Sequence, residues 1–241
     1  MKRIHLENVG KLYPRFQGVR SLLGPNRGWW KGSPGWFWSL KDVSFSLPSG
    51  KWLGIIGANG SGKTTLLRIV AGVTEPTRGT VAVNGRIVSL LELFAGMQPD
   101  LTGSENIFLN GLLLGMRRQE IQRKFKSIVE FAGVGDFLDM PLKHYSTGMA
   151  MRIGFSVGLH VEANLFLIDE AWSVGDPDFQ AKSLERLGSL SREGAAVILV
   201  THDLEIIRKH APETLWLDHG VIADSGRSES VIQNYLRGNP A

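Results

Sequence analysis

Short apolar runs alternate along this chain with segments whose apolar residues recur at helical spacing. The runs typical of strands are 52–57, 80–84, 87–91, 165–169, 196–201, 214–218 and 221–224. Strands that alternate with helical segments indicate a largely parallel sheet connected by crossover helices. The pattern therefore predicts an α/β fold.

The middle of the chain has a different pattern. From 104 to 155 it is mostly helical, and apolar side chains recur near i, i+4 and i+7 at Ile121, Phe125, Ile128, Val129 and Ala132. We expect one domain over 1–241, with an α/β core at 1–100 and 160–241 and a helical subdomain at 101–159. The absence of an internal repeat of 20 to 50 residues argues against a solenoid.

Composition excludes several classes of protein. The 241 residues include no Cys, so disulfide scaffolds and thiolate metal sites are excluded, and 43% hydrophobic with 21% charged residues is typical of a folded globular protein. No apolar run approaches the ~18 residues that a transmembrane helix needs. We therefore expect any role at a membrane to depend on a partner.

The segment 15–38 is rich in tryptophan and in basic residues. It contains Trp29, Trp30, Trp36, Trp38, Arg15, Arg20, Arg27 and Lys31 and no acidic residue. The glycines and prolines between them predict irregular backbone, and the length favours a functional insertion. Tryptophan with arginine suits a protein interface near lipid headgroups. Four cations are a weak nucleic-acid footprint, so we expect no nucleic-acid partner.

The stretch GANGSGKT at 57–64 matches the phosphate-binding pattern GxxxxGK(S/T). It follows the strand WLGIIG and opens the helix KTTLLRIVAG, which directs backbone N–H groups at a polyanion. Lys63 would reach the β and γ oxygens of a nucleotide, and the Thr64 hydroxyl would bind Mg²⁺. The residues expected to bind the nucleotide are Gly57, Asn59, Gly60, Ser61, Gly62, Lys63, Thr64 and Thr65.

Two further apolar runs end in polar residues. LFLIDE at 165–170 places Asp169 where a P-loop ATPase holds Mg²⁺ and Glu170 where a carboxylate can deprotonate the attacking water. VILVTHD at 197–203 places His202 at the end of a neighbouring strand, where its imidazole can hydrogen-bond a γ-phosphate. We predict Glu170 and His202 as catalytic residues and Asp169 with Thr64 as metal ligands.

This combination resembles the nucleotide-binding subunit of ATP-binding cassette (ABC) transporters. Their Leu-Ser-Gly-Gly-Gln signature corresponds to the stretch 145–149, where Ser146 and Gly148 match and Thr147 and Met149 depart. The departures, together with the loop 173–176 that ends at Asp176, look like the ATPase subunits of O-antigen, capsule and teichoic-acid exporters. The resemblance covers nearly the whole chain and implies a RecA-like α/β core with a small antiparallel β region and an inserted helical subdomain.

The resemblance implies ATP and Mg²⁺ as cofactors and a second copy of the chain as partner. Residues 146–149 would complete the ATP site of that copy, and Asp176 would be the D-loop residue. It further implies a transmembrane permease, export of a lipid-linked polysaccharide, and a location on the cytoplasmic face of the inner membrane. The alternatives are another type of ABC transporter, or a soluble ABC ATPase of DNA repair or translation. The lack of a long heptad coiled coil argues against the soluble ATPase.

Two residues of the site stay undecided: one metal ligand and the aromatic residue that stacks on adenine. Most ABC ATPases have a Gln after the strand near Leu90, and here Glu92 is the nearest polar candidate for that metal ligand, with Gln98 a poorer one. The family places an adenine-stacking aromatic at the end of its first strand, which makes Tyr13 the first choice. Phe37 and Trp38 are the alternatives.

Overall fold

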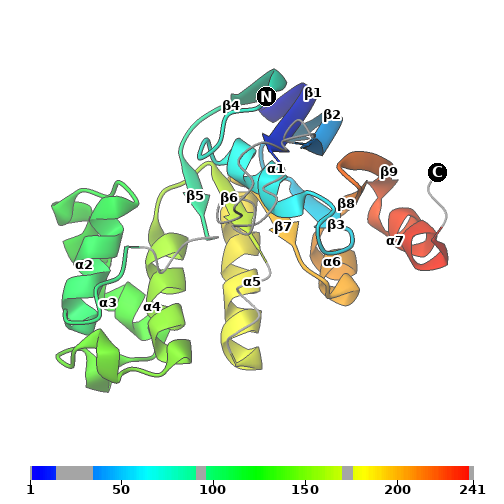
Figure 1. Cartoon of the computed structure of the whole chain (residues 1–241). Coiled ribbons are helices and arrows are strands. Elements are labelled where there is room, and N and C mark those ends of the chain that lie inside the picture. Colours follow the sequence, from blue (N-terminus) through cyan, green and yellow to red (C-terminus); the bar gives the residue numbers. More distant parts are fainter. Residues whose placement is uncertain (1, 15–34, 91–95, 170–175, 239–241) are drawn as a thin grey trace, which may run out of the picture.

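The computed structural model describes residues 2–14, 35–90, 96–169 and 176–238, and a six-stranded sheet forms its centre (Figure 1). In spatial order the strands are β5 (Ile87–Ser89), β6 (Leu165–Ile168), β7 (Ala196–Val200), β3 (Trp52–Ile56), β8 (Glu213–Asp218) and β9 (Val221–Arg227). All neighbours pair in parallel except β8 and β9, which are antiparallel. The predicted α/β fold is confirmed.

The central strands are buried on both faces because their side chains alternate between two apolar cores. On β6 and β7, Phe166 and Val197 belong to one core, and Leu167 and Ile198 belong to the other. Helices α5 (Pro177–Arg192), α6 (Leu204–His210) and α7 (Ser228–Arg237) contribute to the first core, and α1 (Lys63–Val70) contributes to the second. This packing fixes the ends of the strands, which carry the predicted chemistry.

A second, three-stranded antiparallel sheet covers the α1 side of the molecule. Its order is β2 (Trp36–Pro48), β1 (Lys2–Pro14) and β4 (Arg78–Val83), and it packs through residues such as Ile4, Leu6 and Val43. The small antiparallel β region expected from the resemblance is therefore present.

One expectation about the insertion is wrong. Residues 36–38 belong to the regular strand β2, where the composition predicted irregular backbone, because Trp36 pairs with Pro14 and Trp38 with Leu12. Long-range pairing with β1 overrides the local glycine and proline signal there. Residues 15–34 lie outside the described part of the chain.

The helical subdomain projects from one side of the central sheet, on the left of Figure 1. It contains α2 (Gly103–Leu113), α3 (Arg118–Ala132), the single 3₁₀ turns Gly135–Phe137 and Leu142–His144, and α4 (Thr147–His160). The helical spacing around 121–132 corresponds to α3, where Ile121, Ile128 and Ala132 are buried and Phe125 and Val129 pack against the same core. Of the helices in the described ranges, none is long and apolar enough to cross a membrane.

Candidate functional site

The predicted phosphate loop, Asp169 and His202 follow three adjacent strands. The strands β6, β7 and β3 are neighbours and run in parallel, so their carboxyl ends meet at one edge of the sheet. Asp169 follows β6, His202 lies two residues beyond β7, and the loop 57–62 follows β3. This is the edge where ligands bind in open α/β sheets.

The phosphate loop depends on its glycines for its backbone conformation. Gly57 has φ 149° and Gly62 has φ 108°, both in the region that side chains disfavour. A Cβ on Gly57 would lie 2.1 Å from the carbonyl oxygen of Leu217. The loop therefore packs directly against β8, and Gly62 leads into α1 without a side-chain cap. The first N–H groups of α1 are thus available to an anion.

Lys63 lies folded over the loop. Its Nζ donates to the carbonyl oxygens of Gly57 at 2.8 Å and Ala58 at 3.0 Å, and the residue is buried. The Ser61 hydroxyl is also buried and has no hydrogen-bond partner among the residues that the structure describes. An ammonium group held by neutral carbonyls can exchange them for phosphate oxygens, which form the stronger, charge-assisted bond.

A cavity of about 350 Å³ lies above the loop. The described residues that line it are Phe37, Ser39, Asn59, Gly60, Gly62, Lys63, Thr64, Thr65 and Asp169. Six of the eight residues predicted at 57–65 to bind the nucleotide are in this set, and Gly57, Ser61 and the predicted adenine-stacking Tyr13 are not among its described lining.

The cavity fits a magnesium ion by the chemistry of its donors. The Thr64 hydroxyl and the Asp169 carboxylate both line it, and oxygen atoms of this kind are the ligands that Mg²⁺ takes beside nucleotide phosphates. Glu92 and Glu170, predicted as metal ligand and general base, lie outside the described residues.

Among the three aromatic candidates, Phe37 is the one that lines the cavity. Tyr13 pairs with Phe37 across the β1–β2 ribbon, with ring centroids 6.0 Å apart, and is absent from the described lining. Trp38 has the guanidinium of Arg78 over its ring at 4.6 Å. The geometry therefore favours Phe37, which the sequence left as an alternative, over Tyr13.

Ser39 is a cavity residue that sequence reasoning missed. Its hydroxyl donates to Thr65 Oγ1 at 2.8 Å, which connects β2 to α1. Its carbonyl oxygen lies 2.6 Å from the Cβ positions that would be built on Gly62 and on Gly220. A serine in a strand carries no recognisable signal, so only the structure reveals this contact.

His202 is exposed at the carboxyl edge and is not among the described residues that line the cavity. The residues on either side of it are fixed. Asp203 caps α6 by accepting from the backbone N–H groups of Glu205 and Ile206, and the Asp203 N–H donates to Thr201 Oγ1 at 3.1 Å. The contact of His202 with a γ-phosphate stays a prediction.

The signature stretch lies at the exposed start of α4. Ser146 is the N-cap, and its hydroxyl accepts from the Met149 N–H at 3.2 Å. Ser146 and Thr147 are exposed, and among the described residues the nearest atom to a Cβ built on Gly148 is the Ser146 Oγ, at 3.9 Å. None of the four signature residues lines the cavity of its own chain. This helix start is therefore open to an external anion.

Asp176 is the N-cap of α5 and accepts from the Phe179 N–H at 2.9 Å. It also pairs with the Arg152 guanidinium of α4. The hydrogen bond from Phe179 and then the bond from Arg152 hold the pKa of the Asp176 carboxyl below its usual value. Asp176 is thus ionised at neutral pH and connects the signature helix to α5.

Comparison with known proteins identifies relatives over the whole chain. A family profile described as ABC transporter matches residues 40–173. The O-antigen export system ATP-binding protein RfbB of Klebsiella pneumoniae is 38% identical over 237 residues, which cover 96% of each chain. The teichoic acids export ATP-binding protein TagH of Listeria monocytogenes serotype 4b is 36% identical over 237 residues, covering 97% of this chain and 69% of TagH.

Solved structures agree with the fold. A structure described as the ATP binding subunit of an ABC transporter has a TM-score of 0.76 at 21% identity and covers 99% of this chain and 94% of its own. A dimeric bacterial ABC transporter cassette has a TM-score of 0.75 at 23% identity, with 93% of this chain and 98% of that chain covered.

Proposed function

The chain belongs to the ABC transporter family, and from this membership we propose that it is the ATP-hydrolysing subunit that powers export of a lipid-linked polysaccharide through a transmembrane partner. The observation that carries the proposal is the similarity to an O-antigen export ATP-binding protein over 96% of both chains. The relative named for teichoic acids export supports an export role of the same kind.

ATP binds in the 350 Å³ cavity. The N–H groups of the loop and of the first turn of α1 face the phosphates, and Lys63 exchanges its two carbonyl partners for β and γ oxygens. Phe37 stacks on the adenine. The Thr64 hydroxyl and the Asp169 carboxylate hold Mg²⁺, which neutralises phosphate charge when bound.

Hydrolysis requires a base beside the γ-phosphate. Glu170, directly after Asp169 in the chain, accepts a proton from the attacking water, which an amide at that position could not do. His202, at the end of the adjacent strand β7, donates a hydrogen bond to the γ-phosphate.

A second copy of the chain completes the site. The exposed N-terminus of α4, with Ser146 as its cap, supplies N–H groups and a hydroxyl to the γ-phosphate held by the other protomer. In this arrangement ATP lies between the two copies and holds them together.

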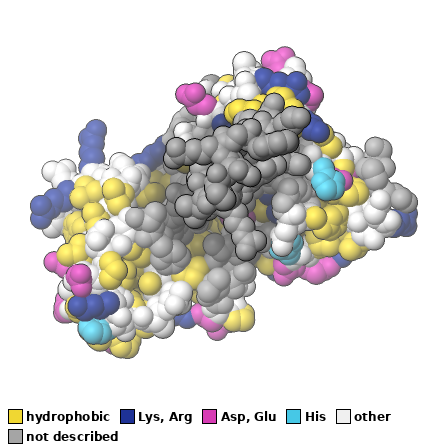
Figure 2. Space-filling model, viewed as in Figure 1, with side chains coloured by type: hydrophobic (Ala, Val, Ile, Leu, Met, Phe, Trp, Pro, Cys, Tyr) yellow, Lys and Arg dark blue, Asp and Glu magenta, His cyan; other side chains and the backbone are white. Residues whose placement is uncertain are grey.

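The helical subdomain offers a surface for the transmembrane partner. On α2, Leu112 is 51% exposed and Leu113 is 62% exposed, and a pocket of about 330 Å³ is lined by Phe108, Leu112 and Arg118 with Ser104 and Glu105. Figure 2 shows hydrophobic side chains at the surface of this subdomain. Such a surface is typical of a protein interface, and docking there holds the subunit at the cytoplasmic face of the membrane.

The test is export in cells that lack the chromosomal copy of this gene. Wild type should restore surface polysaccharide. Glu170→Gln should bind ATP but hydrolyse it at least ~10²-fold more slowly, and it should fail to restore export. Asp178→Asn, a charge change elsewhere in the chain, is the matched control and should behave like wild type.

Two outcomes would contradict the proposal. Normal hydrolysis by Glu170→Gln would remove Glu170 as the base. Normal surface polysaccharide in cells without the gene, with the purified protein associated with ribosomes or DNA, would favour a soluble ABC ATPase instead.

A further inference from the structure

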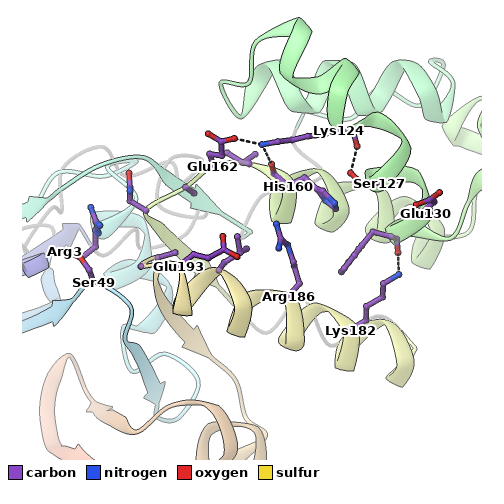
Figure 3. Close-up of a pocket in the computed structure, with 17 residues that line it drawn as sticks. Arg3, Ser49, Lys124, Ser127, Glu130, His160, Glu162, Lys182, Arg186 and Glu193 are labelled. Carbon is purple, nitrogen blue, oxygen red and sulfur yellow. Dashed lines mark hydrogen bonds and ion pairs between the residues drawn. The ribbon is translucent and has the colours of Figure 1, made fainter.

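A second large cavity lies at the opposite edge of the central sheet from the nucleotide. Its volume is about 1110 Å³, and residues just before β3, β6 and β7 line one side of it: Ser49, Ala163, Asn164, Gly194 and Ala195. Helix α3, the end of α4 and one face of α5 form the other sides (Figure 3). We call this cavity the basal groove.

Two cations of α5 face the basal groove. Lys182 and Arg186 are four residues apart, so they lie on one face of the helix, where like charges destabilise it. Arg186 forms no hydrogen bond or ion pair with any residue in the described ranges, and Figure 3 shows it extending from α5 toward His160. Among the described residues, Lys182 Nζ donates to the Phe131 carbonyl oxygen at 3.4 Å and lies 4.4 Å from the centroid of the Phe131 ring.

The acidic side chains of the groove have other partners. Glu162 binds Lys124 at 2.9 Å, Glu130 lies 3.7 Å from Lys126, and Glu193 accepts from the Ser189 hydroxyl at 3.2 Å. Lys124 also donates to the carbonyl oxygen of His160 at 3.0 Å, which neutralises the negative end of α4. Neither Lys182 nor Arg186 forms an ion pair with a carboxylate in the described part of the chain.

His160 completes the arrangement. One ring nitrogen, Nδ1, lies 2.6 Å from the Ser156 carbonyl oxygen, which can only accept, so Nδ1 carries a proton and donates. Burial, and then the charges of Arg186, Lys124 and Lys182, lower the pKa of His160 below its usual 6.5. The imidazole is thus neutral at pH 7, with Nε2 able to take a proton when negative charge arrives nearby.

We propose that the basal groove is a binding site for a tetrahedral dianion of the phosphate and sulfate class, held between Lys182, Arg186 and His160. A dianion matches two like charges one helical turn apart, and the planar Arg186 guanidinium can bind two of its oxygens. Anion binding also removes the repulsion that the fold leaves among these cations. The site is separate from the nucleotide cavity and does not depend on the proposed export function.

The probe is sulfate, whose charge does not change between pH 5 and 8. Protein saturated with ADP and Mg²⁺ is titrated with sodium sulfate at ionic strength held constant with chloride, and the His160 ring signals are followed by NMR. We expect saturable binding with a Kd in the millimolar range or tighter. Sulfate should raise the pKa of His160, so affinity should increase as the pH falls toward the lowered pKa of the free protein.

The groups that face His160 set this pH dependence: Lys124 and Glu130 from α3, Lys182 and Arg186 from α5, and Glu162 beyond α4. Arg186→Gln should weaken sulfate binding at least ~10-fold, since it removes a charge-assisted bond. Lys182→Gln should have a similar effect. Arg192→Gln changes the same charge on the same helix outside the groove and should bind like wild type. Lys63→Ala, which removes the cation of the phosphate loop, should also retain binding.

Several results would overturn the proposal. One is a His160 signal that responds to chloride and sulfate equally. Another is sulfate binding that survives in both Arg186→Gln and Lys182→Gln but is lost in Lys63→Ala. Titration with inorganic phosphate and with glucose 6-phosphate then distinguishes two sources of the anion, free phosphate and a phosphorylated metabolite. Equal affinities assign the groove to free phosphate, and tighter binding of the sugar phosphate assigns it to a phosphorylated metabolite.

Discussion

Arg152, on the helix that Ser146 caps, forms an ion pair with Asp176, the residue that caps the following helix. The guanidinium of Arg152 also lies over the Phe179 ring at 5.6 Å, so it contacts the first turn of α5 through two residues. The predicted signature stretch and the predicted D-loop residue are therefore held in a fixed relationship within one chain.

Asp176→Asn and Asp176→Ala should separate the two roles of this carboxylate. Asn retains the N-cap and loses the ion pair, whereas Ala loses both, so stability should decrease in the order wild type, Asn, Ala. Urea unfolding at pH 7 measures this order. Asp178→Asn, in the same first turn of α5, is the control and should have a smaller effect.

The effect of Asp176 should depend on pH with a definite sign. Its pKa is lowered in the folded protein, so its contribution is complete above the unfolded value of 3.8 and is lost as the pH falls through the lower, folded pKa. The stability difference between wild type and Asp176→Asn should shrink on acidification below 3.8. A difference that grows instead would show that the charged form is not the stabilising one.

Phe37→Ala should weaken ATP binding about tenfold, because stacking of a base on an aromatic ring contributes about 1–3 kcal/mol. Calorimetry on the purified subunit measures the affinity. Tyr13→Ala is the matched control, since it removes the neighbouring ring that pairs with Phe37 but is not among the described residues lining the cavity. The reverse order of effects would make Tyr13 the adenine platform.

Asn106→Leu should destabilise the protein by about 2–3 kcal/mol. The Asn106 side chain is fully buried, donates to the carbonyl oxygens of Gln98, Leu101 and Thr102 at 2.9–3.0 Å, and accepts from the Gln98 N–H at 2.8 Å. Leucine removes all four bonds and leaves the Gln98 N–H without its acceptor, while each of the three carbonyl oxygens keeps one backbone donor. Urea unfolding gives the free energy of unfolding.

The control for Asn106 is Glu105→Gln. Glu105 and Thr102 form a capping box at the start of α2, and Gln serves the same capping role, so this change should be nearly neutral. An equal loss of stability in both variants would mean that the start of α2, rather than the Asn106 contacts, determines the result.

Ser146→Arg should abolish hydrolysis and leave ATP binding by the monomer intact, because Ser146 lies away from the cavity of its own chain. Mixing Ser146→Arg with Lys63→Ala places both defects in one composite site and leaves the other site wild type. Activity should return in part if one site can act alone. Ordinary hydrolysis by Ser146→Arg by itself would rule out completion of the site by a second copy.

Local pattern predicted the strand ends of the site but not the contacts between distant segments. The phosphate loop, Asp169 and His202 could be placed at one sheet edge because parallel strands align their carboxyl ends. The Arg152–Asp176 pair joins residues 24 positions apart on different helices, and no periodicity indicates it. The basal groove likewise brings together α3, α4 and α5, whose cations look like solvated surface charge in the sequence.

The identity of the aromatic residue that stacks on adenine could not be predicted either, for the same reason. Tyr13 and Phe37 are cross-strand neighbours, so both lie close to the nucleotide edge, and the sequence could not decide between them. Which of the two rings lies nearer the cavity depends on the register of β1 with β2. That register includes irregularities near Lys11 that no local signal predicts.

The Ser39 carbonyl, enclosed between Gly62 and Gly220, has a consequence for how this cassette can diversify. The Gly220 carbonyl oxygen accepts from the Lys41 N–H at 2.7 Å, and the Gly220 N–H donates to the Ser61 carbonyl oxygen at 2.9 Å. These two bonds connect the β1–β2 ribbon, the turn at Gly220 and the phosphate loop. The pairing of Pro14 with Trp36 closes the β1–β2 ribbon beyond that point. We therefore expect that the chain between residues 14 and 36 can change in length and sequence without displacing the phosphate loop.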